Sequence, residues 1–309
     1  MATARALLVD PDHPMHYHIV SRCVRQSWLC GWDRVRRKDY SHRKQALKER
    51  LFRLVKCFAV ELHGFAIMSN HFHLVLRYDP CACHRWTRVE VAERWVAATA
   101  HKHVLDDTRQ VRARVTAISS DPETVQRLRH RLGSLSAFMQ QLKQPVARNA
   151  NLEDGVTGHF FDNRFYSGAL LSEQALLAAM AYVDLNPVRA GIAKDIEECD
   201  YTSIEERLRD NSADRLEQLL GPLASGLKSD EGHSLGHISL VTYTNSLRAI
   251  VRLTQTTKPN NHDIGSARVR RWARHVATLS RRQRAFGKVE QLSAWLKQRN
   301  MRILETAFN

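Results

Sequence analysis

Two histidines stand one residue apart in an otherwise apolar segment, FAIMSNHFHLVL, which spans residues 65–76. Because a strand alternates its faces, we expect His71 and His73 to project to one side and Phe72 to the other. Two neighbouring imidazoles on a sheet can bind one divalent cation while the phenylalanine stays in the core. Taken alone, such a pair is more often part of a solvated strand face. Other motifs in the sequence are therefore needed to distinguish a metal-binding pair from a solvated one.

The second informative segment is AYVDLNPVRAG, residues 181–191. Tyr182 and Asn186 are four residues apart on the last turn of a predicted helix, so their side chains share a face. By itself, a tyrosine on an amphipathic helix is usually a core residue with its hydroxyl satisfied. The tyrosine therefore gains a chemical interpretation only in combination with the histidine pair.

The charge of the chain points to a polyanionic partner. The 309 residues include 47 Lys plus Arg against 32 Asp plus Glu, which gives a formal net charge of +15. A surplus of this size is typical of proteins that bind nucleic acid, although a merely basic soluble protein is the alternative. The sequence contains neither GxxxxGK nor GxGxxG, so nothing in it indicates ATP or a dinucleotide.

The remaining composition indicates a cytoplasmic globular protein, here expected to be nucleoid-associated. No secretory signal is predicted, and no eighteen apolar residues run together, so we expect no membrane partner. Six cysteines are too dilute for a disulfide framework, and we interpret them as reduced thiols. The segment CACH at residues 81–84 lacks a second ligand pair at zinc-finger spacing and is interpreted as a loop.

Apolar periodicity predicts a mixture of strands and helices. The predicted strands cover residues 16–24, 60–67, 72–77 and 159–171. The predicted helices begin at residue 41 and otherwise cover residues 89–103, 123–131, 135–148 and 172–185. Pro122 is expected to open one helix and Pro145 to kink or end another, whereas Ser172 is expected to cap the helix that carries Tyr182.

This order of elements predicts an α+β fold with a small antiparallel sheet backed by helices. We predict one domain over residues 1–205, with a helical insert at about 79–135. A linker over 206–239 and a basic helical C-terminal extension over 240–309 complete the predicted organisation. In the extension, many arginines surround Trp272 and Trp295, which predicts a DNA-holding tail, with a solvated basic helical bundle as the alternative.

Three motifs agree with one family in order and spacing: SNHFHLV, GHFFDNRF and YVDLNPVRAG. Together they resemble the REP-associated tyrosine transposases, a branch of the single-tyrosine HUH transposases with an insertion sequence 200-like domain. The resemblance covers about residues 15–203. It implies a ferredoxin-like antiparallel sheet (the HUH fold). It also implies an endonuclease and strand transferase that acts in DNA transposition and recombination, on single-stranded DNA with hairpin-forming repeats.

The same resemblance implies roles for individual residues. Tyr182 would be the nucleophile, forming a 5′-phosphotyrosine intermediate that retains the bond energy and needs no nucleotide cofactor. His71 and His73 would bind Mg²⁺ or Mn²⁺. Asn186 occupies the position that completes the metal site, but an outer-shell or helix-terminating role is equally open.

Three arginines occupy family positions near the implied site: Arg22, Arg164 and Arg189. They are expected to contact phosphates or bases of hairpin or single-stranded DNA, with plain surface charge as the alternative. The run His159, Phe160 and Phe161 could stack bases, although a strand-core position is expected for at least one phenylalanine. The sequence leaves monomer and homodimer open.

Two other functions remain as alternatives. The chain could be a domesticated, non-catalytic protein that binds hairpin DNA, although the positions expected to be catalytic are intact. It could also be a histidine–metal phosphoesterase, which would need more acidic ligands near the histidine pair. Glu61 is the nearby acidic candidate.

Overall fold

The fold is built on a five-stranded mixed sheet with the strand order β4-β5-β1-β6-β7. The structure is a computed structural model that describes residues 5–24, 30–33, 37–209, 238–255, 267–281 and 283–301. The strands are β1 (Met15–Arg22), β4 (Val60–Ile67), β5 (His71–Tyr78), β6 (Tyr166–Leu170) and β7 (Ala285–Phe286). The first four pair antiparallel, and β7 runs parallel to β6 at the edge.

The core elements follow the order β1, α2 (Ser41–Val55), β4, β5, α7 (Leu135–Asp154), β6. With β1 between β5 and β6, and β4 outside β5, this β-α-β-β-α-β arrangement is ferredoxin-like. The predicted fold class is therefore confirmed. A separate two-stranded ribbon pairs β2 (Trp32–Asp33) with β3 (Lys38–Asp39).

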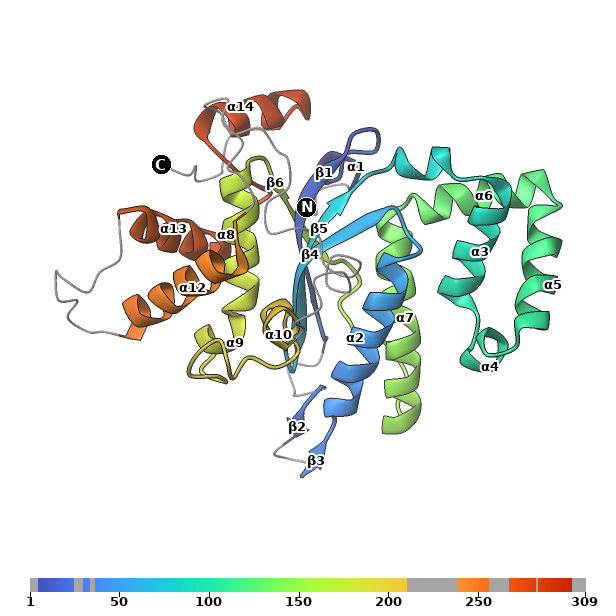
Figure 1. Cartoon of the computed structure of the whole chain (residues 1–309), viewed down its shortest axis with the longest axis horizontal. Helices are drawn as coiled ribbons and strands as arrows, with labels where there is room; N and C mark the ends of the chain where they lie inside the picture. The colour runs from blue at the N-terminus through green and yellow to red at the C-terminus, as the bar shows by residue number, and fades with distance from the viewer. Residues whose placement is uncertain are drawn as a thin grey trace.

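Helices cover both faces of the sheet (Figure 1). One hydrophobic core lies between the sheet and the pair α2 and α7, and it includes Phe72 and Leu74 of β5. The second core lies under α8 (Glu173–Asp184) and includes Val75 of the same strand. The alternation of β5 therefore divides its side chains between the two cores, as its sequence predicted.

The helical insert lies between β5 and α7 in the chain. It consists of η1 (Ala82–Arg85), α3 (Arg88–Thr99), α4 (Lys102–Leu105), α5 (Thr108–Ser119) and α6 (Pro122–Leu132). The single helix predicted over 89–103 is divided at Ala100, and α5 was not predicted. No residue of α5 is fully buried, but Val111, Val115 and Ile118 share one face at helical spacing and pack against α3 and α4, so an apolar stripe was present in the sequence. Pro122 opens α6 behind the Asp121 cap.

Pro145 does not end its helix, and the predicted boundary near residue 148 is wrong, because α7 continues to Asp154. A proline inside a helix leaves the carbonyl four residues earlier without its partner, here that of Gln141. Arg50 Nε of α2 donates to this Gln141 carbonyl. The neighbouring helix thus satisfies the group that proline frees. The helix ends at Gly155, whose φ of 64° suits a glycine.

An ion-pair cluster joins the start of α2 to the end of α7. Arg43 Nη2 lies 2.6 Å from Asp154 Oδ1 and 2.8 Å from Glu153 Oε2. Lys38 and His42 also bond to the Glu153 carboxylate, each at 2.9 Å. The cluster fixes the ends of the two helices that back the sheet.

Acid should weaken this cluster. Partial burial raises the pKa of Glu153, but hydrogen bonds from Lys38, Arg43 and His42 outweigh it and bring the pKa to about 2. Because the folded-state pKa lies below the ordinary 4.5, the stabilisation is present above pH 4.5 and is lost towards pH 2. We expect Glu153→Gln to cost about 1 kcal/mol at pH 7 and nothing near pH 2. Urea denaturation of both proteins across this pH range measures the difference, and an equal loss at both ends would contradict it.

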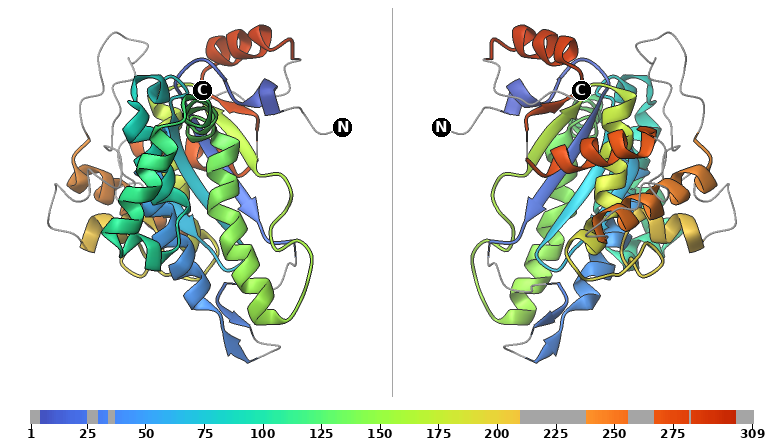
Figure 2. Two further views of the ribbon diagram at one scale, coloured as in Figure 1. Left: turned by 90° about the vertical axis from the view of Figure 1, so that its right-hand side faces the viewer. Right: turned by 90° about the vertical axis from the view of Figure 1, so that its left-hand side faces the viewer.

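The C-terminal segment belongs to the same packed body. Its helices α12 (Leu240–Gln255) and α13 (Ala267–Thr278) lie beside α8 in Figures 1 and 2, and they share its hydrophobic core. Strand β7 extends the sheet, with Leu171 N donating to the Phe286 carbonyl at 2.9 Å. The segment predicted as a linker over 206–239 lies mostly outside the described residues; α10 (Ser203–Arg209) occupies its start.

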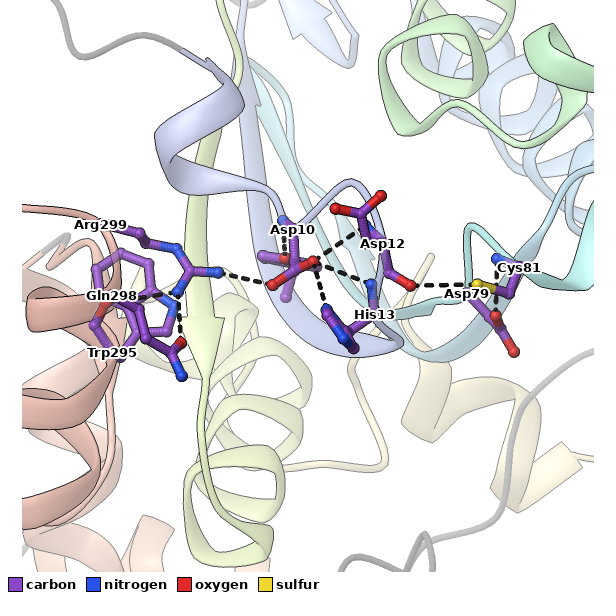
Figure 3. A network of polar contacts seen from close by, with 9 residues as sticks. Asp10, Asp12, His13, Asp79, Cys81, Trp295, Gln298 and Arg299 are labelled. Atoms are coloured by element: carbon purple, nitrogen blue, oxygen red, sulfur yellow. Dashed lines mark hydrogen bonds and ion pairs between the residues drawn. The ribbon is translucent and has the colours of Figure 1, made fainter.

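The last helix, α14 (Val289–Gln298), is fixed to the N-terminal turn (Figure 3). Arg299 Nη2 donates to Asp10 Oδ2 at 3.0 Å, and its guanidinium lies over the Trp295 ring. Trp295 is only 3% exposed, and Trp272 is half-buried against Tyr243. Trp295 is therefore a core side chain with no free face for stacking on DNA, whereas DNA binding by the basic tail as a whole stays a prediction.

Candidate functional site

The histidine pair lies on the face of β5 that α8 covers. His73 is 4% exposed and His71 is half-buried, while Phe72 points into the opposite core. The ring centroids of His71 and His73 are 4.9 Å apart. Both imidazoles therefore project to one side, and the solvated-face alternative does not hold for His73.

A third histidine, His18 of the central strand β1, completes the cluster. Its Nε2 lies 2.9 Å from His73 Nδ1, and the two rings stack at 5.2 Å. No motif in the sequence pointed to this residue. The alternation of β1 could have placed it on a face with His16 and Val20, but its contact with His73 depends on the pairing of β1 with β5.

Asn186 connects the two histidines of the motif. It begins α9 (Asn186–Arg189), directly after the helix that carries Tyr182. Its Nδ2 lies 3.3 Å from His73 Nε2, and its side chain also hydrogen-bonds to His71. The predicted trio of His71, His73 and Asn186 is thus brought together. Its role as a metal site stays a prediction.

Tyr182 faces this cluster from α8. Its ring centroid lies 5.6 Å from that of His73 and 5.6 Å from that of His18, in edge-on contacts. The ring is half-buried, and the Arg189 guanidinium lies 5.1 Å from its centroid. A phenol, three imidazoles and one guanidinium therefore meet on one face of the sheet.

The local sequence explains why α8 presents this tyrosine. The Ser172 hydroxyl accepts a hydrogen bond from Ala175 N at the start of the helix, as predicted, and Glu173 stands in the first turn. Apart from Tyr182, the described helix is almost wholly buried. Because Pro187 prevents α8 from continuing, the chain turns there and directs Asn186 back to the histidines.

Burial keeps the three histidines neutral. It lowers the pKa of His18 to about 3 and, helped by the Arg22 charge, that of His71 to about 4. Burial also lowers the pKa of His73 well below its ordinary value, as do the neighbouring His18, His71 and Arg22. Neutral imidazoles are the form that coordinates a metal, so near pH 7 the three rings have the protonation state that the predicted metal site requires.

The hydrogen bonds leave the Nε2 atoms of the motif facing the site. His71 Nδ1 pairs with Asn70 Oδ1 at 2.6 Å, and His73 Nδ1 pairs with His18. If Nδ1 of each motif histidine carries the proton, Asn70 Oδ1 and His18 Nε2 accept the two hydrogen bonds. Nε2 of His71 and of His73 then each keep a lone pair. In this arrangement His18 carries its proton on Nδ1, and that atom is buried without a hydrogen-bond partner.

This donor set fits a divalent cation with few protein ligands. Two Nε2 atoms and the Asn186 amide oxygen, once the amide is turned, would supply three ligands and leave positions for phosphate oxygens or water. Imidazole nitrogen suits Mn²⁺ better than Mg²⁺. Across the described ranges, no three His, Cys, Asp or Glu side chains are grouped to hold a metal, so the fit depends on the amide.

The three predicted DNA-binding arginines lie in different places. Arg22 is exposed at the end of β1, directly opposite His71 in the strand pairing. Arg189 lies beside Tyr182, as described above. Arg164 is exposed and lines a separate groove of about 890 Å³ along α7. The structure thus brings two of the three arginines to the histidine–tyrosine cluster.

The residues that were predicted to stack on bases line the groove beside Arg164. Its lining includes His159, Phe160 and Phe161. His159 is exposed, whereas Phe160 and Phe161 are 4% and 5% exposed, and Phe161 packs edge-on against Phe72. Both phenylalanines are therefore core residues, and only His159 of the three could stack on a base.

We expect His18→Leu to weaken metal binding at this site. The substitution removes the acceptor of His73 Nδ1 and with it the fixed orientation of that ring. Loss of such an outer-shell partner typically costs about 10–100-fold in metal affinity. Mn²⁺ titration by calorimetry measures the change. His16→Leu is the matched control, because His16 lies on the same strand but contacts His63; an equal loss in both variants would contradict the assignment.

Comparison with known proteins yields one structural likeness. No protein-family model matches the chain, and no curated protein sequence matches it. A solved structure described as the REP-associated tyrosine transposase bound to a REP hairpin is similar over 78% of this chain and 99% of that chain. The TM-score is 0.40 and the sequence identity 10%, an identity too low to transfer residue roles.

No helix in the described segments has the length and apolarity needed to cross a bilayer.

Proposed function

We propose that the protein is a metal-dependent DNA strand transferase that cuts and rejoins hairpin-forming single-stranded DNA through Tyr182. The observation that carries this proposal is the placement of the Tyr182 ring 5.6 Å from His73, whose neighbour Asn186 also bonds to His71. A phenol beside two imidazoles that would hold a cation is an arrangement suited to nucleophilic attack on a phosphodiester.

The residues that would hold the cation are His71, His73 and Asn186. When bound, Mg²⁺ or Mn²⁺ would polarise the scissile phosphate and offset the charge that develops on its oxygens. His18 orients the His73 ring through its Nδ1 contact. Asn70 does the same for His71.

Tyr182 supplies the nucleophile. Its phenolic oxygen forms a bond to phosphorus while the bond between phosphorus and the 3′ oxygen breaks, and the 3′ end leaves as a hydroxyl group. The product is a 5′-phosphotyrosine, from which a second 3′-hydroxyl can regenerate the phosphodiester and the free tyrosine. Arg189, which lies against the ring, would contact the phosphate oxygens and position them for attack.

The positive charge of the chain supports DNA as the partner. The formal net charge of +15 favours a polyanion, and exposed Arg22 and Arg189 border the site. Exposed Arg164 in the groove along α7 would contact a further part of the strand. Because these would be phosphate contacts, binding should weaken steeply as salt is raised.

The direct test uses the full chain and a labelled single-stranded hairpin DNA. With Mn²⁺ present, a denaturing gel should show a DNA–protein adduct, and peptide mapping should place the nucleotide on Tyr182. Chelation of the metal should prevent the adduct. Tight hairpin binding without cleavage under Mg²⁺ or Mn²⁺ would instead favour a domesticated DNA-binding protein.

A further inference from the structure

Two cysteines border the turn that leads into His71. The backbone N–H of Cys23, at the end of β1, donates to the Asn70 carbonyl at 2.9 Å. The backbone N–H of Cys30 donates to the adjacent Ser69 carbonyl, also at 2.9 Å. Since the two amides bind consecutive carbonyls of one turn, the two cysteines lie side by side although seven positions separate them in the sequence.

Their thiols face each other in the core. Cys23 is 6% exposed and Cys30 is 3% exposed, and the two thiols interact directly, because each shifts the pKa of the other. The other four cysteines differ, because each donates its thiol to a backbone carbonyl: Cys57 to Arg53, Cys81 to Asp12, Cys83 to Pro80 and Cys199 to Asp195. All six cysteines belong to the described residues, and none of them is joined in a disulfide there.

The charges around the pair favour one thiolate. The hydrogen bond from Cys23 lowers the pKa of Cys30, and the nearby Arg43 and Lys44 charges act in the same direction against burial. The hydrogen bond to Cys30, followed by burial, raises the pKa of Cys23. Lys44 packs beside Gly31, the residue after Cys30. Cys30 is therefore the nucleophilic sulfur, and Cys23 is the proton donor beside it.

We propose that Cys23 and Cys30 form a redox-active dithiol that a peroxide converts into a disulfide. The inference does not depend on the proposed strand-transfer function. It rests on the facing thiols and on the two backbone contacts that hold them in place.

The reaction balances with hydrogen peroxide as the oxidant. The Cys30 thiolate attacks one peroxide oxygen, which breaks the O–O bond, gives a sulfenic acid on Cys30 and releases hydroxide. The Cys23 sulfur then attacks the Cys30 sulfur and expels its hydroxyl group. The proton of Cys23 leaves with that group as water. The two sulfurs together lose two electrons, and the peroxide is reduced to one hydroxide and one water, the hydroxide becoming the second water when it takes up the proton that the Cys30 thiol had released.

The disulfide would lie next to the candidate site. It would tie together the two chain segments whose amides hold the Ser69–Asn70 turn. The Asn70 side chain in turn accepts the hydrogen bond from His71 Nδ1. Oxidation would thus fix covalently the backbone that orients one histidine of the motif.

The test counts thiols in the full-length protein in a Cys81→Ser background, which removes the exposed cysteine. The background has five cysteines, one fewer than the six of the sequence. After hydrogen peroxide and denaturation, maleimide labelling should find three free thiols, and a peptide map should show a Cys23–Cys30 crosslink. Adding Cys30→Ser should leave all four remaining thiols free. Adding Cys57→Ser, another buried cysteine, should leave two thiols free and the crosslink present.

The proposal is overturned if the Cys23–Cys30 crosslink is missing at a peroxide dose that oxidises Cys81 in a parallel wild-type sample. It is also overturned if either cysteine pairs with a different partner. Circular dichroism checks the folding of each variant. The crosslink is mapped in the Cys81→Ser background, which keeps both Cys23 and Cys30. The presence or absence of the disulfide can therefore be measured even if Cys30→Ser does not fold.

Discussion

Tyr182→Phe is expected to abolish the covalent DNA adduct and to reduce strand cleavage by on the order of 10⁴-fold or more. Phenylalanine keeps the ring that packs against His18 and His73, so the site should retain its shape. It lacks the oxygen that attacks phosphorus. Single-turnover cleavage of labelled hairpin DNA with Mn²⁺ measures the effect.

Tyr166→Phe is the matched control for this variant. Tyr166 also lies near His18, at 6.0 Å between ring centroids, but its hydroxyl donates to the Gln283 carbonyl. It should form the adduct at the wild-type level. Hairpin binding by Tyr182→Phe should stay within a few-fold of wild type, because the arginines are unchanged. An adduct that persists in Tyr182→Phe would remove the tyrosine from its proposed role.

Asp184→Ala is expected to give the largest loss of stability among single substitutions near the site. Asp184 is fully buried, two residues after Tyr182. Its carboxylate accepts from the Ser203 hydroxyl, from Ile204 N at 2.9 Å and from the Tyr243 hydroxyl at 2.7 Å. Arg207 Nη1 lies 3.9 Å away. The residue therefore joins α8 to both α10 and α12.

Removing this carboxylate leaves three buried donors without their acceptor and takes a negative charge away from the buried Arg207 guanidinium, which typically costs about 3–5 kcal/mol. Burial raises the pKa of Asp184, so desolvation already offsets part of what its partners contribute, and we expect the low end of that range. Urea denaturation of the full chain measures the loss.

Tyr243→Phe is the comparison for Asp184→Ala, because it removes one hydrogen bond to the same carboxylate. It should cost about 1 kcal/mol. A loss in Asp184→Ala no larger than that of Tyr243→Phe would show that the carboxylate does not hold the three helices together.

Local sequence patterns determined which side chains share a face. The alternation of β5 placed His71 and His73 opposite Phe72. The four-residue spacing of Tyr182 and Asn186 did not put them on one helix, because α8 ends at Asp184 and Asn186 begins α9. The cap at Ser172 and the stop at Pro187 fixed the helix between them. These features depend on interactions within a few residues, so a single sequence is enough to predict them.

Only the tertiary structure decided which of these faces meet. The contact of His18 with His73 joins residues 55 positions apart, and it depends on the register of β1 and β5. The continuation of α7 past Pro145 depends on an arginine of another helix. The burial of Trp295 depends on α14 packing beside the sheet. Such pairings are set by the free energy of packing distant segments together, which no local periodicity contains.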